Sequence, residues 1–352
     1  MSSRLLVRVI SNTLTIFNCT LLLTDNIQIK LDLLRDCTAA VNDWFLLNGL
    51  SLSLDKSEVL LLGIFAKLIT IGAVGQVSVA GASINTTDSI KNLGLVWDSG
   101  LTFNKHVGQV CQSSYFHIMA LRRICGWLSP EVANIVACTI VEARLDYCNS
   151  IVYGTSKYNI SRVQHVLYTL AHVVTSTKKL NHITPVLHRL HWLPIQCRTE
   201  YKVAMLALKI RETGQPSYLS HAVQPKEVTR NLRTSDDNSI VYPDMRSMKS
   251  DFACRAFSFV VPTVWNKVPS DLHQLSNKVY KLPPSVESWK LLFKSAFGHV
   301  ENWSLTIIVP TIRFLSCNIW CIINLCTYFS IFTTPLSWWS DKKFQNLISS
   351  IY

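Results

Sequence analysis

The stretch NISRVQHVLYTLAHVVT, residues 159–175, has the periodicity of an amphipathic helix. Its aliphatic residues recur three or four positions apart, so they share one side of a helix with 3.6 residues per turn. Arg162, His165 and His172 fall off that side, and we interpret the two histidines as polar-face or groove residues. A one-sided helix buries its apolar face against other helices, so the stretch predicts a bundle. The apolar set is Ile160, Val163, Val166, Leu167, Leu170 and Val174.

Helices are also predicted on both sides of this stretch. One covers 106–126, and Ser129-Pro130-Glu131 begins a second that runs to about Tyr147, with a capping hydroxyl and proline at the first helical position. Thr184-Pro185 begins a short helix, and another covers 196–212. In that last helix Arg198, Lys202 and Lys209 fall on one stripe. Such a stripe can follow a phosphate backbone, or it can be an ordinary solvent-facing surface.

The residues before this helical region contain one predicted helix and several short predicted strands. Residues 30–47 have helical spacing, whereas Glu58–Gly63, Gln76–Gly81 and Leu93–Trp97 are typical of strands. Residues 213–285 are rich in proline and loops, and Val286–Phe297 is predicted to be a final amphipathic helix. We therefore predict an α+β fold: a small β-containing element (1–105), a mainly α-helical basic bundle (106–212), a loop-rich region (213–300) and a hydrophobic helical tail (301–352).

Charge and composition narrow the class of protein. The chain has 34 Lys and Arg against 22 Asp and Glu, and 49% of its residues are hydrophobic. This apolar content excludes general disorder, and 12 glycines without a repeat exclude collagen. Between Lys157 and Arg233 there are 12 basic and three acidic residues, with six histidines. This local excess favours a polyanionic partner such as nucleic acid, although a solvated basic surface is the alternative.

Metal and nucleophile motifs give little support for an enzyme. The 11 cysteines include no CxxC pair, which favours free thiols in a reducing compartment, the cytoplasm or nucleus. His182, His188 and His191 resemble a zinc site only weakly, because no acidic residue lies between Asp146 and Glu200. Neither a P-loop nor a GxSxG motif is present. We expect no metal site in this chain.

The tail differs from the rest of the chain. Phe314–Phe332 contains 19 residues without charge, close to the length that spans a bilayer. Three interpretations remain open: a membrane anchor, a buried hydrophobic helix, or translated non-coding sequence. The first would make the protein membrane-bound through 314–332.

Several ordered blocks resemble the C-terminal part of reverse transcriptases from non-LTR retrotransposons, the LINE type that includes the jockey-like group. The match covers about residues 15–300. The blocks that carry it are Trp44–Glu58, Lys91–Asp98 with Leu101–Phe103 and His106, Ala143–Ser150 with Tyr153-Gly154, His182–Pro185, Leu190–Ile195 with Arg198, Leu232–Ser235, Arg255–Phe257, Pro262, Trp265-Asn266 and Trp289-Lys290.

The resemblance implies the end of a polymerase palm, over 1–105, followed by a thumb, over 106–212. Intact members are RNA-directed DNA polymerases, in which palm aspartates hold two Mg²⁺ ions. Here Asn18 and Cys19 stand at the expected Asp-Asp positions, and neither suits Mg²⁺. No Asp-Asp pair precedes Asp236-Asp237. Lys56 matches a position that can protonate pyrophosphate, but an exposed lysine after a turn is an equal interpretation.

Our leading hypothesis is a truncated, catalytically inactive descendant of such a reverse transcriptase that retains RNA and DNA backbone binding. One alternative is an active polymerase, if upstream sequence or another chain restores the carboxylates; a second is the membrane-anchored protein. The residues expected to contact phosphates are Arg144, Arg162, Lys178, Lys179, Arg189, Arg198, Lys202 and Lys209.

Overall fold

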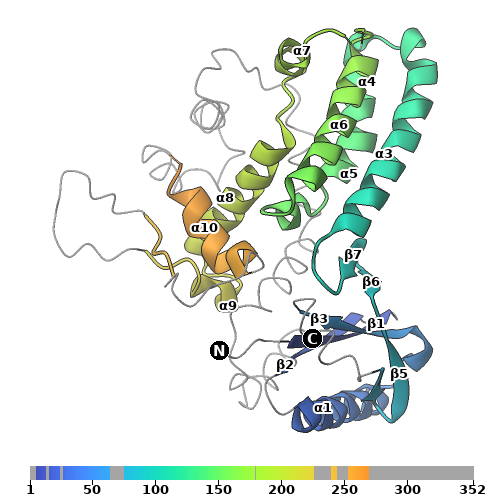
Figure 1. Cartoon of the computed structure of the whole chain (residues 1–352), viewed down its shortest axis with the longest axis vertical. Coiled ribbons are helices and arrows are strands. Elements are labelled where there is room, and N and C mark those ends of the chain that lie inside the picture. Colours follow the sequence, from blue (N-terminus) through green and yellow to red (C-terminus); the bar gives the residue numbers. More distant parts are fainter. Residues whose placement is uncertain are drawn as a thin grey trace, which may run out of the picture. The chain divides into compact units, whose positions relative to one another are not determined.

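The computed structural model describes residues 5–12, 16–23, 27–63, 75–178, 180–225, 239–243 and 253–268. These residues form two compact units, one that ends at His106 and one that begins at Val107 (Figure 1). Strands occur in the first unit and long helices in both, so the fold is α+β, as predicted. The sequence-based boundary between 105 and 106 lies one residue from this division.

A five-stranded sheet forms the N-terminal unit, in the order β2-β1-β3-β5-β4. Neighbouring strands are antiparallel, except that β3 and β5 run parallel. Asn18 and Cys19 lie in β2, where their backbones pair with Ile10 and Val9 of β1. The strands are β1 (Leu5–Asn12), β2 (Ile16–Leu23), β3 (Ser57–Leu62), β4 (Gln76–Val79) and β5 (Ala82–Thr87).

Two tight hairpins follow β3. Ala80-Gly81 joins β4 to β5, and Leu93-Gly94 joins β6 (Ser89–Asn92) to β7 (Leu95–Asp98). All four turn residues have positive φ, between 47° and 85°. Such turns match the twist of the flanking strands, and glycine adopts this conformation without a steric penalty. The prediction of strand at Leu93 and Gly94 is therefore wrong, because these two residues form the turn.

Helix α1 (Ile27–Leu47) packs on this sheet and is hydrogen-bonded to the turn between β4 and β5. Leu34 and Phe45 of the helix are buried, as are Val59 and Leu60 of β3. The hydroxyl of Thr38 accepts a 3.2 Å hydrogen bond from the backbone N–H of Ala80. The buried apolar residues on helix and strand form the core of the unit.

A capped turn after β7 leads into the first long helix of the C-terminal unit. The Asp98 carboxylate accepts hydrogen bonds from the backbone N–H groups of Thr102 and Phe103, at 2.7 and 2.8 Å. The rings of Trp97 and Phe103 are both buried and meet edge to face, 5.9 Å apart. This turn positions Asn104, where helix α3 begins.

Three helical segments run up, down and up in the C-terminal unit. Helix α3 (Asn104–Ile124) ends in a 3₁₀ turn, the chain returns through α4 (Pro130–Ala137), a π-helical turn (Cys138–Glu142) and α5 (Ala143–Asp146), and α6 (Lys157–Val174) follows. An added Cβ at Gly108 would lie 3.4 Å from Arg162, and the Cys125 thiol donates to the carbonyl of Val173. Helices α3 and α6 are thus parallel, and their C-terminal ends lie together (Figure 1).

The sequence periodicity of 159–175 is confirmed by burial. Five of its six predicted apolar residues are buried, and Ile160 is half-buried. The predicted start at Ser129 is also confirmed: its side chain accepts a hydrogen bond from the backbone N–H of Val132, and Pro130 is the first helical residue.

Helices α7 (Ile183–Leu190), α8 (Ile195–Thr213), α9 (Ser217–Ser220) and α10 (Phe257–Trp265) complete the described part of this unit. Helix α10 packs on α8, and the guanidinium of Arg211 lies over the Trp265 ring, 5.1 Å from its centre. Within the region predicted to be rich in loops, 213–285, residues 257–265 thus form a helix that the sequence analysis did not identify. Pro262 signalled a break, but a buried apolar helix offsets the one hydrogen bond that proline lacks.

The predicted helix Val286–Phe297 and the tail 301–352, including 314–332, lie outside the described residues. Within the described ranges, the structure contains no helix whose length and apolar character would allow it to cross a bilayer.

Candidate nucleic-acid interface

Arg198 forms a buried ion network with two carboxylates. Its guanidinium donates to Glu142 at 2.6 Å and to Asp146 at 3.1 Å, and its Nε donates to the carbonyl of Leu193 at 2.8 Å. Only 9% of the Arg198 side chain and 8% of the Glu142 side chain are exposed. The network therefore joins α8 to the α4–α5 segment inside the unit.

Local structure turns these carboxylates inward. In the π-helical turn the Ala143 N–H reaches back to the Cys138 carbonyl, which inserts one residue relative to α-helical spacing. Glu142 and Asp146 are four residues apart, so they share the face that meets the first turns of α8. The amide of Asn149 donates to the other oxygen of Asp146, at 3.2 Å.

The electrostatics of this network keep the arginine charged. Burial alone lowers the pKa of Arg198, but the carboxylates of Asp146 and Glu142 raise it overall. Burial raises the pKa of Glu142 above its ordinary value, although Arg198 acts in the opposite direction. A buried arginine whose charge is balanced by two carboxylates is not accessible to a phosphate at the surface.

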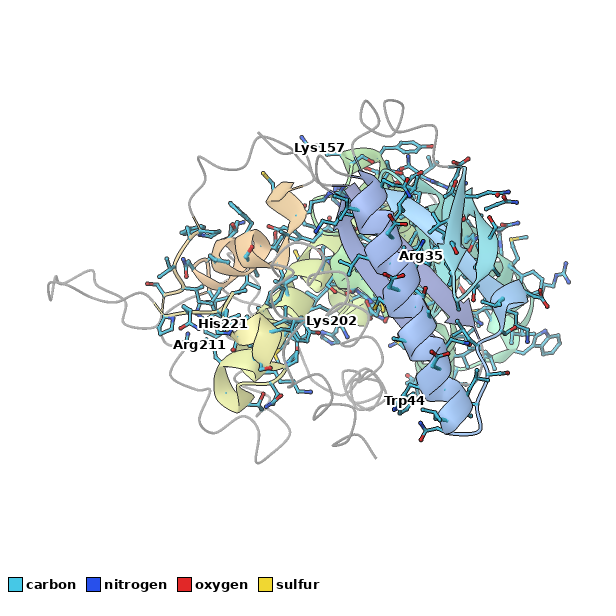
Figure 2. All side chains as sticks on the ribbon, turned by 90° about the horizontal axis from the view of Figure 1, so that it is seen from below. Arg35, Trp44, Lys157, Lys202, Arg211 and His221 are labelled. Atoms are coloured by element: carbon cyan, nitrogen blue, oxygen red, sulfur yellow. The ribbon has the colours of Figure 1, made fainter. Side chains whose placement is uncertain are left out.

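The expectation that Arg198 contacts phosphates is therefore corrected. A helical wheel places it with Lys202 and Lys209, yet the structure buries Arg198 and leaves those lysines half-exposed on the same helix. Figure 2 labels Lys202 on this helix. A helical wheel gives only the angle at which a residue leaves the helix axis, and not which other segment lies there. In the structure the segment after α5, Asn149–Val152, packs against α8. Which residue on a stripe is buried depends on this tertiary contact.

The other predicted contacts that the structure describes stay at or near the surface. Arg144, Lys178 and Arg189 are exposed, and Arg162 is half-buried with its guanidinium over the Tyr158 ring, 5.5 Å from the centre. Within the described ranges none of these, nor Lys202 or Lys209, lies within ion-pair distance of a carboxylate. Lys179 lies outside the described residues.

Charge in the described part of the C-terminal unit is strongly unbalanced. It contains 13 Lys and Arg residues but only five Asp and Glu, a net charge of +8. Arg198 occupies two of the five carboxylates, Glu142 and Asp146. Glu131, Glu200 and Glu212 therefore remain to balance 12 other basic side chains.

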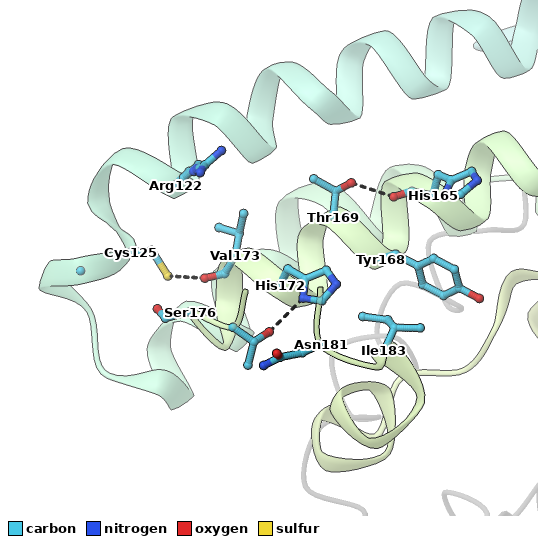
Figure 3. A pocket seen from close by; sticks show the side chains of 12 residues that line it. Arg122, Cys125, His165, Tyr168, Thr169, His172, Val173, Ser176, Asn181 and Ile183 are labelled. Atoms are coloured by element: carbon cyan, nitrogen blue, oxygen red, sulfur yellow. Dashed lines mark hydrogen bonds between the residues drawn. The ribbon is translucent and has the colours of Figure 1, made fainter. Parts of the chain in front are cut away.

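A pocket of about 580 Å³ lies where the C-terminal ends of α3 and α6 meet (Figure 3). It includes the cationic or titratable groups Arg122, His165 and His172, and none of its 12 lining residues is acidic. Thr169, Ser176, Thr177 and Asn181 add polar groups, and Tyr168, Val173 and Ile183 add apolar surface. We call this site the α3–α6 pocket.

The two histidines of this pocket match the interpretation as groove residues, and Lys178 directly follows the lining residue Thr177. Sequence reasoning missed Arg122, which is exposed at the end of α3. A signal exists in the pair Arg122-Arg123, because basic residues in a last helical turn complement the helix dipole. That signal marks the C-terminal end of α3 but does not reveal that the C-terminal end of α6 lies beside it.

The residues considered for catalysis or metal binding in the sequence are not gathered into a site in the part of the chain that the structure describes. Lys56 is exposed in the turn that precedes β3. His182 and His188 are exposed and His191 is half-buried. Among the described residues, no three His, Cys, Asp or Glu side chains are grouped so that they could hold a metal ion.

Comparison with known proteins adds no relationship. No family model, curated protein or solved structure matches this chain. The geometry of the C-terminal unit is therefore the basis for a functional conclusion.

Proposed function

We propose that this protein binds the phosphate backbone of RNA and DNA through the C-terminal helical unit. The observation that carries the proposal is the buried Arg198 network, because it removes two of the five described carboxylates from the surface balance. The basic residues that remain outside it give the surface a positive field. Such a field attracts a polyanion without selecting its sequence.

The contact set is the exposed and half-exposed members of the predicted list, without Arg198. Side chains on several elements, rather than one helical stripe, would neutralise successive phosphates. The set is Arg144, Arg162, Lys178, Arg189, Lys202 and Lys209.

The resemblance to LINE-type reverse transcriptases supports the same partner. A thumb grips the nucleic-acid duplex in such a polymerase, and the blocks that carry the resemblance imply a thumb over 106–212. We propose descent from this family without polymerase activity in the chain. An amide at position 18 and a thiol at position 19 do not fit Mg²⁺, which prefers anionic oxygen ligands, so no catalytic step is derived.

A salt titration tests the proposal. Binding of a 20-nucleotide RNA and of a 20-base-pair DNA is measured from 50 to 300 mM KCl with the full chain. The logarithm of the affinity is expected to fall linearly with the logarithm of salt, because bound cations leave the nucleic acid when phosphates are neutralised. Affinity that does not change with salt would contradict phosphate-dominated binding.

A primer-extension assay tests the inactive state. No nucleotide incorporation is expected with Mg²⁺ or Mn²⁺ on a primed RNA template. Incorporation would contradict the loss of catalysis and would favour carboxylates supplied by residues other than 18 and 19.

A further inference from the structure

We infer that the α3–α6 pocket holds one unstacked nucleotide of a single strand, with a base N–H donating to Nε2 of His172 and a phosphate on Arg122. This inference rests on the proposed function, because it specifies where a bound strand meets the helical unit. It assigns a role to groups outside the predicted phosphate contacts.

The hydrogen bonds around His172 determine which nitrogen of its ring carries the proton. Three short contacts form a chain from the ring: His172 Nδ1 to Thr177 Oγ1 at 2.9 Å, Thr177 Oγ1 to Thr175 Oγ1 at 2.9 Å, and Thr175 Oγ1 to the Ala171 carbonyl at 2.8 Å. The first of these contacts is the dashed line at the His172 ring in Figure 3. Three hydrogen bonds need three hydrogens, and the two hydroxyls supply two. The third must come from Nδ1, so Nδ1 carries a proton.

This arrangement leaves the other ring nitrogen of His172, Nε2, available to a ligand. With Nδ1 protonated, Nε2 of a neutral imidazole is a hydrogen-bond acceptor. Nε2 has no hydrogen-bond partner among the described residues, and Figure 3 shows it on the side of the ring away from Thr177. The pocket therefore contains a lone pair held in a fixed direction. It fits a ligand with an N–H group.

The volume and the lining of the pocket indicate the class of ligand that it can hold. A volume of about 580 Å³ lies within the range of small-molecule sites. Tyr168, Val173 and Ile183 give apolar surface for a ring, and the amide of Asn181 gives a further donor and acceptor. Arg122, without any carboxylate in the lining, suits a phosphate. Apolar ring contact, an N–H acceptor and a cation together match a nucleotide.

The helix ends around the pocket do not oppose this assignment. The C-terminal ends of α3 and α6 carry partial negative charge, but their carbonyls are partly satisfied: Val173 accepts from Cys125, Ala171 from Thr175 and His172 from the backbone N–H of Thr177. Arg122 adds positive charge at these ends, and the neutral ring of His172 adds none. The charged or titratable groups that line the pocket are Arg122 from α3, Cys125 from the 3₁₀ turn after it, and His165, Tyr168 and His172 from α6. The lining residues 176–183 add none.

An exposed tryptophan next to the pocket favours single strands. Trp127 is 90% exposed and directly follows the lining residue Gly126. Large exposed aromatic rings beside cations stack unpaired bases, and bases in a duplex do not present their faces. The neighbouring nucleotide of a bound strand would stack there.

The test uses the full chain with a five-nucleotide uridylate and its N3-methyluridine counterpart, which lacks the base N–H. Wild-type protein is expected to bind the methylated strand about 3- to 10-fold more weakly, the effect of one hydrogen bond. His172→Ala should bind both strands equally, His172→Gln should recover part of the difference, and Arg122→Ala should lower the salt slope by about 0.7. Lys91→Ala, on β6 of the N-terminal unit, is the matched control and should behave as wild type.

The outcomes separate the two proposals. If the wild-type chain binds no nucleic acid, the proposed function and the inference both fail. If binding depends on salt but ignores the N3-methyl group, His172 and Arg122, the inference fails and the proposed function stands. Because the methylated strand is tested on wild-type protein, the result does not depend on the folding of any variant.

Discussion

The helical unit contains two clusters of polar side chains, each with one arginine, and their surroundings are opposite. In the buried network, Arg198 is enclosed by Glu142 and Asp146. In the α3–α6 pocket, Arg122 and His172 face a space with no acidic lining residue. The difference teaches that a basic residue becomes structural where a neighbouring element supplies carboxylates, and remains available to a ligand where it does not.

Removal of Arg198 should have the largest effect on stability. Arg198→Ala leaves two carboxylates in a site without a counter-charge, which is expected to destabilise the fold by about 3–5 kcal/mol. Urea unfolding followed by circular dichroism measures this. Lys209→Ala, on the same helix, is the control, and equal effects of the two variants would contradict the distinction between the clusters.

His106 is a buried histidine that belongs neither to the Arg198 network nor to the α3–α6 pocket. Burial lowers the pKa of His106 to about 4, so the unfolded chain binds the proton more readily than the folded protein. This contribution is present above about pH 6.5 and is lost as pH falls toward 4, in total about 3 kcal/mol. His106→Gln should flatten the stability profile between pH 7 and 4, as measured by urea midpoints. An unchanged slope would show that the pKa of His106 is the same in the folded and the unfolded chain.

Neutralisation of the whole buried network should restore most of the stability lost in Arg198→Ala. The triple variant Arg198→Met, Glu142→Gln, Asp146→Asn removes all three charges together and keeps similar side-chain volumes. We expect its stability to lie within about 2 kcal/mol of wild type, because desolvation opposes the ion-pair attraction. Stability as low as that of Arg198→Ala would instead mean that the geometry of the guanidinium, and not charge balance, holds α8 in place.

The half-exposed lysines of α8, Lys202 and Lys209, should give the smallest change in stability and a clear change in binding. Lys202→Ala with Lys209→Ala is expected to alter the unfolding free energy by less than about 0.5 kcal/mol per site. The same variant should lower the salt slope for single-stranded RNA by about 1.4, if each lysine neutralises one phosphate. A wild-type slope would remove these two lysines from the contact set.

Much of the helical framework follows from local signals. Ser129-Pro130-Glu131 marks a helix start, and the three-and-four spacing of 159–175 identifies the buried side of α6. Helix α10 escaped prediction because Pro262 is a local signal for a break, whereas its burial against α8 is a distant effect. The strand β5 escaped prediction because its alternation is between partly covered and exposed positions, with few large apolar side chains.

The sequence by itself determined the period of the helices, their starts and the excess of basic residues, because each depends on neighbours a few positions apart. Only the tertiary structure decided that Arg198 is buried while Lys202 is not, since this depends on Glu142 and Asp146, more than 50 residues earlier in the chain. The same holds for the placement of Arg122 and His172 around one pocket. Electrostatic interactions act across space, and the distances between these charges exist only once the helices have packed.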